Sequence, residues 1–245
     1  ETKRTELDPL LQKPGREIAS MFDSIAKRYD ALNHLLSAGL DKRWRARAVR
    51  ELGLTGRERL LDVCTGTGDL ALAALGAGGG RHAREVVGVD FAHEMLKIAA
   101  AKARASASDG RFHIARGDAT QLPVPSRGYD AAWSGFGIRN VQQPEAALRE
   151  IARALRPGGR LAILEFGFPK IPGLRALYKW YFRAVLPRVG RAVSKHGKAY
   201  SYLPASVERF PSPEAFAEML RSAGFARIRA VPLAFGIVYL YVAEL

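Results

Sequence analysis

This sequence has almost no cysteine, few acidic residues relative to basic ones, and no long apolar run. Its 245 residues include a single cysteine, Cys64, which excludes an internal disulfide framework and favours a reducing compartment. No run of about 18 apolar residues occurs and the first residues show no signal-peptide pattern, so we expect no membrane span. No cluster of His and Cys indicates a metal site. These absences predict a cytoplasmic protein without disulfides or metal.

The charge balance is strongly basic. There are 38 Lys and Arg residues against 24 Asp and Glu, which gives a net charge of +14. Such a balance favours anionic partners, namely nucleic acid, an anionic lipid surface or an acidic substrate. Residues 169–209 alone hold nine basic residues against one acid, Glu208, whereas codon bias could account for many of the other arginines. The hydrophobic fraction of 48% is typical of a globular protein.

A strand of the buried type runs directly into a glycine turn that ends in a carboxylate. Gly66 and Gly68 allow tight backbone angles and leave room for a ligand at the main chain. With Ala71 they also fit the dinucleotide fingerprint, and Asp90 lies about where the ribose-binding acid of that fingerprint is expected. Asp69, however, would repel a pyrophosphate and would suit a cation such as the ammonium of S-adenosylmethionine. The turn predicts a nucleoside-bearing cofactor.

Strands and helices alternate from residue 59 onward, which predicts a parallel sheet covered by helices on both faces. The expected strands are 59–64, 85–90, 112–116, 129–134 and 160–166, with later apolar runs at 226–231 and 236–242. Expected helices are 69–75, 93–104, 144–155 and 213–223, after two amino-terminal helices within 16–56 that are separated by a turn at 33–41. We expect residues 1–15 to form a flexible arm, 16–245 a single domain and 169–209 a helical lid insertion.

The order of these signals resembles the class I S-adenosylmethionine-dependent methyltransferases. The features that carry the resemblance are the glycine turn, the acid that ends the second strand, Asp118-Ala119 after the third strand and Pro157-Gly158-Gly159 before the fifth. The resemblance implies an α/β fold of Rossmann-like type, with a mostly parallel seven-stranded sheet and helices on both faces. It also implies S-adenosyl-L-methionine as the cofactor.

Four further segments resemble the ubiquinone/menaquinone biosynthesis C-methyltransferases. They are Tyr29-Asp30-Ala31-Leu32-Asn33, Gly135-Phe136-Gly137-Ile138-Arg139-Asn140-Val141, residues 153–159 together with Leu164-Glu165-Phe166, and residues 200–207. The sequence departs from the family at four positions. Asp41 stands where the family usually has His, Leu32 where Met is common and Gly167 where Ser is common, and some members have Ser at the position of Gly135. The family implies methylation of a prenylated quinol ring. The short chain favours demethylmenaquinol as the substrate, and a ubiquinone precursor is the alternative.

The resemblance also assigns cofactor contacts residue by residue. They are Gly66, Thr67, Gly68 and Asp69 in the turn, Asp90 at the ribose hydroxyls, and Asp118 and Ala119 beside the adenine. A carboxylate suits two hydroxyls because it offers two acceptor oxygens. Each acid also has a purely structural interpretation, as a helix cap for Asp69 or a turn former for Asp90 and Asp118.

The chemistry places its main demand on the phenol of the quinol. The sulfonium is already activated, so the protein mainly aligns the reactants, but a phenol with a pKa of about 10 must lose its proton. Arg139 is the leading catalytic candidate, either stabilising the phenolate or orienting a water that Asn140 fixes, because a guanidinium cannot act as a base. A loop-capping surface arginine is the alternative. Candidate substrate contacts are Tyr29, Asp30, Asn33 and Tyr200, with Tyr29 equally suited to the core.

The basic segment also predicts an amphipathic helix. Leu174, Leu177, Tyr178, Tyr181 and Val185 share one helical face, and Arg175, Lys179 and Arg183 share another. Such a helix suits peripheral contact with an anionic membrane at its inner face, and a lid packed on the sheet is the alternative. A homodimer is left open.

Three rival functions remain at this point: methylation of RNA, non-catalytic binding by a basic protein, and methylation of another small aromatic compound. The sequence has no Asn-Pro-Pro-Tyr-type motif and no appended RNA-binding module, so we expect no nucleic-acid partner.

Overall fold

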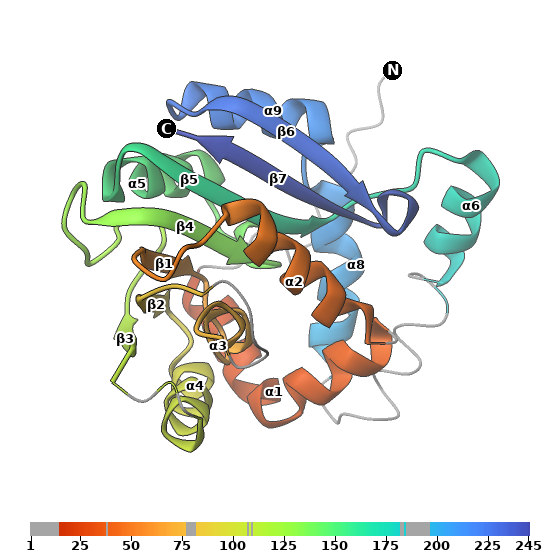
Figure 1. Ribbon diagram of the computed structural model, residues 1–245. Helices are drawn as coiled ribbons and strands as arrows, with labels where there is room; N and C mark the ends of the chain where they lie inside the picture. Colours follow the sequence, from red (N-terminus) through yellow and green to blue (C-terminus); the bar gives the residue numbers. More distant parts are fainter. Residues whose placement is uncertain are drawn as a thin grey trace.

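The structure is a computed structural model that describes residues 15–37, 39–76, 82–106, 108, 110–181, 184 and 197–245. The expected arm therefore lies, apart from Gly15, outside the described residues. Within them a seven-stranded sheet runs through the centre of the molecule (Figure 1). Its strands are β1 (Arg59–Val63), β2 (Glu85–Asp90), β3 (Phe112–Arg116), β4 (Tyr129–Gly135), β5 (Leu155–Phe166), β6 (Ala226–Leu233) and β7 (Val238–Glu244).

The sheet has the order β3-β2-β1-β4-β5-β7-β6. Strands β1 to β5 are parallel to one another, whereas β7 is antiparallel to both β5 and β6. The predicted mostly parallel seven-stranded sheet is therefore confirmed. Because the parallel strands all point the same way, their carboxyl ends and the loops that follow them meet at one edge of the sheet.

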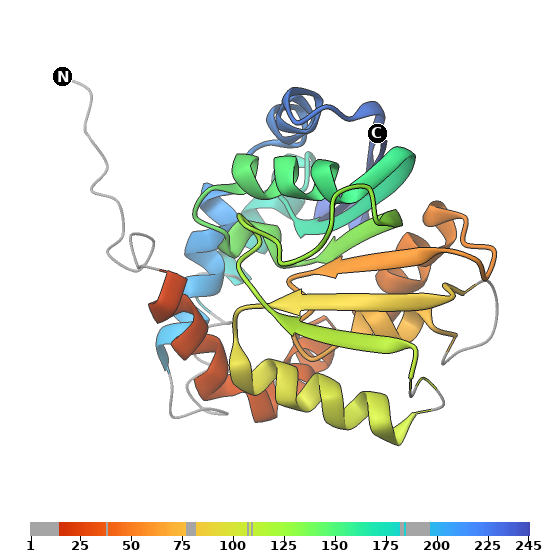
Figure 2. The same cartoon turned by 90° about the vertical axis from the view of Figure 1, so that its left-hand side faces the viewer.

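Helices cover both faces of this sheet. The longer helices are α1 (Gly15–Leu36), α2 (Leu40–Leu52), α3 (Asp69–Ala74), α4 (His93–Ala105), α5 (Pro144–Ala154), α6 (Pro172–Trp180), α8 (Gly197–Arg209) and α9 (Pro213–Ser222). Two short 3₁₀ turns are η2 (Ile138–Asn140) and η4 (Ala234–Gly236). One buried cluster joins the sheet to α2, α3 and α4, and the other joins it to α5 and α9. Helices α1 and α8 instead lie beyond the carboxyl ends of the strands (Figure 2).

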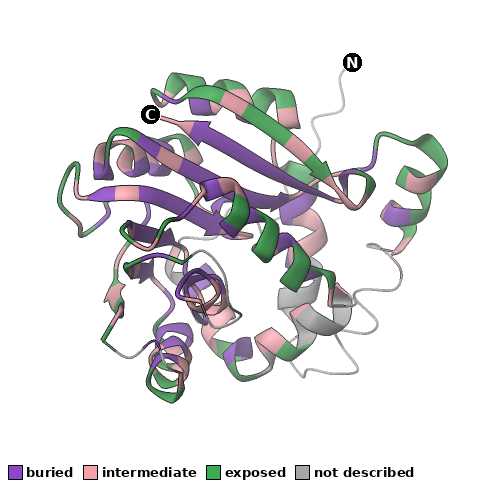
Figure 3. Ribbon diagram, viewed as in Figure 1, coloured by how far each residue is buried: buried purple, intermediate pink, exposed green. Residues whose placement is uncertain are grey.

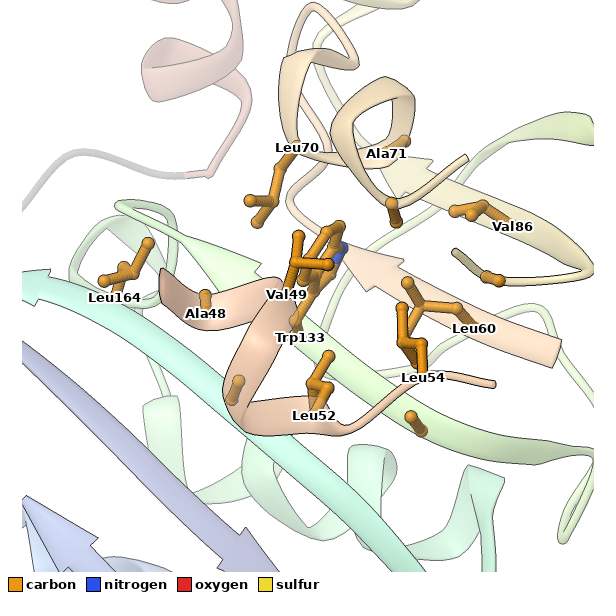
Figure 4. Packing of buried hydrophobic residues seen from close by; sticks show 14 of the residues in the cluster. Ala48, Val49, Leu52, Leu54, Leu60, Leu70, Ala71, Val86, Trp133 and Leu164 are labelled. Atoms are coloured by element: carbon orange, nitrogen blue, oxygen red, sulfur yellow. The ribbon is translucent and has the colours of Figure 1, made fainter. Parts of the chain in front are cut away.

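Strand alternation explains how one sheet supplies two cores. In β4, Ala131 and Trp133 face the α2–α4 layer, whereas Ala132 faces the α5–α9 layer, because successive side chains point to opposite faces. Trp133 is fully buried, and Figure 4 shows it among side chains of α2, α3 and β1. In Figure 3 the central strands are mostly buried, whereas the edge strand β6 is largely exposed and the helices are exposed on their outer sides.

Two predicted boundaries are wrong by several residues, whereas the other helix and strand bounds differ by no more than two. The first strand after α5 starts at Leu155 rather than at residue 160, because Leu155 already pairs with Tyr129 and the Pro-Gly-Gly segment continues in the strand, with Gly158 at φ +75°. The turn expected over 33–41 is shorter, since α1 continues to Leu36 and α2 begins directly after Gly39, whose φ is +76°. The expected lid contains α6 and α8, and residues 182–183 and 185–196 between them lie outside the described part of the chain.

Candidate functional site

Two adjoining cavities lie at the carboxyl edge of the parallel strands. The turn cavity, of about 130 Å³, is lined by Gly66 and by residues that follow β2, β3 and β4. The aromatic cavity, of about 310 Å³, lies between α1, α2, α6, α8 and the strand ends. Both are lined by Phe22, Tyr29 and Phe136, which therefore form a shared wall. In an α/β sheet this edge is where ligands bind, so the two cavities are the candidate site.

Asp90, at the end of β2, lines the turn cavity. One carboxylate oxygen accepts a hydrogen bond from the Gly66 N–H at 2.8 Å, and the other accepts from the Ala92 N–H at 2.9 Å. Burial raises the pKa of this carboxyl above its usual value, against the pull of these N–H groups. Each oxygen keeps a lone pair for a further donor, so the fixed carboxylate suits a pair of hydroxyls.

The two glycines of the turn have different roles. Gly66 has φ +56°, and a Cβ added there would meet no atom within 4 Å, so its main chain borders open space in the turn cavity. Gly68 has φ +80°, and a Cβ there would lie 2.7 Å from the Phe112 ring. Gly66 is therefore the glycine that lets a ligand approach, whereas Gly68 serves the packing of the turn on β3.

Thr67 and Asp69 point into an ion-pair network rather than lining a cavity. The Thr67 hydroxyl donates to Asp30 at 2.6 Å, and Lys102 contacts both Asp30 and Asp69. Arg45 contacts Asp69 at 2.8 Å. Although burial acts in the opposite direction, Lys102 and Arg45 hold the pKa of Asp69 below its usual range. In this structure the cations that pair with Asp69 are thus the side chains of Arg45 and Lys102. Asp30, through Thr67, joins α1 to the glycine turn.

Asp118 and Ala119 both line the turn cavity, after β3. Asp118 Oδ1 accepts hydrogen bonds from the N–H and the hydroxyl of Thr120, each at 2.8 Å. Asp118 therefore shapes the turn at the wall of the cavity, and this structural role is compatible with a contact to a ligand. Cys64 lines this cavity as well, and burial raises the pKa of its thiol well above the usual value, which disfavours a nucleophilic role.

Arg139 lies in η2 and lines the aromatic cavity. Its Nη1 is 3.0 Å from Glu165 Oε2, its backbone N–H donates to Glu165 Oε1 at 3.1 Å, and Nη1 also donates to the Phe136 carbonyl. The ring of Phe166 lies 5.3 Å beneath the guanidinium. Glu165 is fully buried, and this burial raises its pKa although Arg139 opposes the shift.

Asn140, the next residue, lines the turn cavity instead. Its Nδ2 donates weakly to the Phe136 carbonyl at 3.4 Å. Asn140 Oδ1 and Arg139 Nε are both buried and have no hydrogen-bond partner among the described residues. Buried polar atoms are rarely left unpaired, so these two atoms are available to a ligand or a water.

The aromatic cavity is built from rings. Phe136 has φ +61°, which is uncommon for a bulky residue, and it packs against Phe166 at 4.7 Å and Trp44 at 6.2 Å between ring centroids. Tyr178 of α6 and Tyr202 of α8 complete the wall. The cavity can therefore hold a flat, largely apolar ring with Arg139 at its edge.

The other predicted substrate contacts are distributed unevenly. Tyr29 lines both cavities and Asn33 lines the aromatic cavity, whereas Asp30 lines neither and belongs to the ion-pair network. Tyr200 lies in α8, and its side chain is outside the described residues. Sequence reasoning missed Tyr202 and Glu165. The signal available for Glu165 was a carboxylate inside the otherwise apolar run Leu161–Phe166.

Comparison with known proteins decides the family. The model of the ubiE/COQ5 methyltransferase family matches residues 11–244. The chain belongs to this family. It is 48% identical to the ubiquinone/menaquinone biosynthesis C-methyltransferase UbiE of Syntrophotalea carbinolica, over 94% of each protein. It is 47% identical to the demethylmenaquinone methyltransferase of Thermus thermophilus, over 91% of this chain and 99% of that protein.

Solved structures support the fold of this ubiE/COQ5 family member. The [4+2]-cyclase SpnF superposes with a TM-score of 0.65 at 20% identity, over 95% of this chain and 96% of that one. An S-adenosylmethionine-dependent methyltransferase from Thermotoga maritima superposes with a TM-score of 0.64 at 19% identity, over 93% of this chain and 99% of that one. The predicted class I methyltransferase fold is confirmed, and the chain is a methyltransferase by family. No helix among the described residues is long and apolar enough to cross a bilayer.

Proposed function

We propose that this protein transfers a methyl group from S-adenosyl-L-methionine to a ring carbon of a prenylated quinol, with demethylmenaquinol as substrate and menaquinol as product. The observation that carries the proposal is the wall of Phe22, Tyr29 and Phe136 shared by the two cavities. A donor in one cavity and a flat ring in the other would meet at this wall. The names of the relatives, UbiE and demethylmenaquinone methyltransferase, point to the same substrate class.

The turn cavity fits the cofactor. The Asp90 carboxylate is fixed by two N–H groups and suits the ribose hydroxyls, and the bare main chain of Gly66 leaves space beside it. Asp118 and Ala119 would bind the adenine edge. When bound, S-adenosylmethionine supplies a methyl group already activated on a sulfonium. The protein needs to supply alignment and exclusion of water.

The aromatic cavity fits the ring of the acceptor. The rings of Phe136, Phe166 and Tyr202 would hold it flat, and Arg139 would face a ring hydroxyl. A fixed guanidinium stabilises the phenolate, so it lowers the pKa of a phenol from its ordinary value of about 10. Ionisation makes the neighbouring ring carbon the nucleophile. The unpaired Asn140 Oδ1 and Arg139 Nε are suited to hold a water that accepts the proton.

The direct test is methyl transfer with the purified protein. With labelled S-adenosylmethionine, reduced demethylmenaquinone should gain one methyl on a ring carbon, as shown by mass and fragmentation. A quinol precursor of ubiquinone is the matched competitor, and we expect its kcat/KM to be at least tenfold lower. Incorporation into neither quinol would refute the proposal. Incorporation into RNA in place of both would revive the rival suggested by the basic composition.

A further inference from the structure

In the described part of the chain, the exposed large apolar side chains are concentrated around the aromatic cavity. Among the residues that the structure describes, those exposed are Leu40, Ile171, Leu177, Trp180 and Phe235, which we call the apolar rim. Every member lies on or beside an element that walls the cavity. Leu40 lines the cavity itself, α6 contributes Tyr178, and Ala234 and Ile237 flank Phe235. Because Leu40 both lines the cavity and is exposed, the cavity reaches the surface at the rim.

Helix α6 has more apolar side chains than it buries against the rest of the protein. Tyr178 is only 7% exposed and lines the aromatic cavity, whereas Leu177 is 57% and Trp180 59% exposed. The sequence predicted Leu177 and Tyr178 on one apolar face, but at 100° per residue the helix turns Leu177 out of the contact that buries Tyr178. Figures 1 and 3 show α6 standing away from the sheet, with most of its surface exposed.

Phe235 extends the rim from a second element. It is 76% exposed at the tip of the β6–β7 hairpin, and both it and Ala234 have positive φ angles, 57° and 45°. This conformation is uncommon for residues with a side chain, so the turn that carries this exposed ring is strained. The tip lies beside the segment that leads into α6, since a Cβ on Gly236 would be 3.5 Å from the Phe168 carbonyl. A grouped apolar surface of this kind marks an interaction site.

The charges around the rim are positive. Helix α6 has no acidic residue, carries Arg175 and Lys179, and follows Lys170. The acid Glu214 lies near Lys170, 3.1 Å from its ammonium. Beside Leu40, the side chains of Lys42 and Arg43 are exposed. Exposed aromatic and aliphatic side chains among lysines and arginines are the pattern of proteins that lie on anionic bilayers.

We propose that the apolar rim docks on the surface of an anionic bilayer and opens the aromatic cavity toward the lipid. The inference rests on the proposed function, because a prenylated quinol resides in the bilayer and would then reach the cavity without crossing water. The rim enters the headgroup region, and the basic side chains around it bind lipid phosphates. A second copy of this chain is the alternative occupant, and the experiments below distinguish the two.

The protein contains its own reporter for this docking. Of its three tryptophans, Trp44 and Trp133 are buried and Trp180 is exposed on the rim. With vesicles of equal parts phosphatidylglycerol and phosphatidylcholine, we expect Trp180 emission to shift to the blue and to be quenched by brominated acyl chains. Binding in co-sedimentation should fall as salt rises. In Trp180→Phe the fluorescence change should disappear while co-sedimentation persists.

Two pairs of variants test the apolar and the basic parts separately. Leu177→Gln with Phe235→Gln should weaken vesicle binding at least tenfold. Arg175→Gln with Lys179→Gln should weaken it and flatten its salt dependence. The matched control is Arg84→Gln with Arg127→Gln, which removes the same charge from exposed residues before β2 and β4, at the opposite end of the sheet. The control should bind vesicles as the unmodified protein does.

Activity assays separate docking from catalysis. Leu177→Gln with Phe235→Gln should lose at least tenfold in rate with a long-tailed quinol in vesicles and keep its rate with a short-tailed, water-soluble quinol. Equal losses on both, or no vesicle binding by the unmodified protein, would overturn the docking proposal. It would also be overturned if Trp180 became shielded with rising protein concentration in the absence of lipid, since that marks a second copy. Vesicle binding without transfer to either quinol would leave docking standing and reject the proposed function.

Discussion

Arg139, the proposed catalytic residue, is held in place by the protein on three sides. The Glu165 carboxylate pairs with the guanidinium and accepts a hydrogen bond from the backbone N–H of Arg139. The Phe136 carbonyl accepts from Nη1, and the Phe166 ring lies beneath the guanidinium. A buried carboxylate opposite a buried guanidinium balances the charge, which makes the desolvated pair tolerable. In the proposed reaction the guanidinium would already be oriented when the substrate arrives, so little reorganisation would be needed as charge develops on a phenol.

This arrangement decides how Arg139 should be tested. Arg139→Ala should cut turnover at least tenfold while the Kd for S-adenosylmethionine, measured by calorimetry, stays within about twofold. The same change leaves Glu165 buried without its partner, which costs about 3 kcal/mol of stability. A second variant that lacks Arg139 but keeps its stability is therefore needed, to separate lost turnover from lost folding.

The double variant Arg139→Leu with Glu165→Leu provides it. Replacing both members of a buried pair by apolar residues is neutral or stabilising, so the double variant should melt no lower than the unmodified protein. Its turnover should be as low as that of Arg139→Ala. Near-normal turnover in this well-folded protein would remove Arg139 from the mechanism.

Asp62 provides a pH-dependent prediction at the same scale. It lies in β1, accepts a hydrogen bond from the Thr65 hydroxyl at 2.6 Å, and its Oδ1 has no partner among the described residues. Burial raises its pKa to about 7, whereas an unfolded aspartate titrates near 4. Between these values the folded state holds a proton that the unfolded state has lost. The free energy of unfolding should therefore fall as pH rises from 5 through 7, with a steepest slope from this group of about 1.4 kcal/mol per pH unit.

Asp62→Asn removes that titration. The difference in unfolding free energy, variant minus unmodified protein, should increase from pH 5 through pH 7 and level off at about pH 8. Urea denaturation at half-unit pH intervals measures it, and other titrating groups cancel in the difference. A difference independent of pH would show that Asp62 is not protonated in the folded state near neutral pH.

At the scale of elements, local patterns predicted the sheet well and tertiary contacts poorly. The bounds of β2 and β3 were predicted correctly, because each is a short apolar run between clear turns. The start of β5 was missed, since only its pairing with β4 shows that Leu155 is extended. The position of Asp90 at the end of a strand follows from its own segment and could be predicted. The ion pairs of Asp69 involve Arg45 and Lys102, which lie in other helices, so the local sequence could not predict them.

The link between α1 and the glycine turn gives a prediction for an element. Asp30 accepts from Thr67 and pairs with Lys102 at 2.6 Å, and α1 carries Phe22 and Tyr29 into both cavities. Asp30→Ala should loosen α1, because a hydrogen bond to a charged group contributes about 1.5–3 kcal/mol. We expect the Kd for S-adenosylmethionine and the KM for quinol each to rise about tenfold, by calorimetry and initial rates.

Lys27→Ala is the control, since Lys27 is exposed on the same helix. It should change neither constant. If Asp30→Ala raised only the KM for quinol, Asp30 would contact the substrate, as the sequence first indicated, and would not act as an anchor for α1.

At the scale of the whole molecule, the candidate site depends on a single sheet. The two buried clusters lie on its opposite faces, and both cavities lie at one edge. The proposed binding of cofactor and acceptor would therefore depend on the same framework as the stability of the protein. We therefore expect residues 16–245 to unfold as one cooperative unit, although α6 and α8 lie at its margin. Calorimetry should show one transition whose calorimetric and van't Hoff enthalpies agree.

Cofactor binding should shift that single transition as a whole. At a free concentration of 100 times the Kd, a ligand that binds only the folded state adds about 2.7 kcal/mol, which for a chain of this length raises Tm by about 5–10 °C. Asp90→Ala should abolish most of the shift, because it removes the carboxylate that Gly66 and Ala92 orient toward the turn cavity. The alternative outcome is two transitions, of which the cofactor shifts only one. It would mean that the helices around the aromatic cavity unfold separately from the sheet. Coupling between the two cavities would then have to arise on ligand binding.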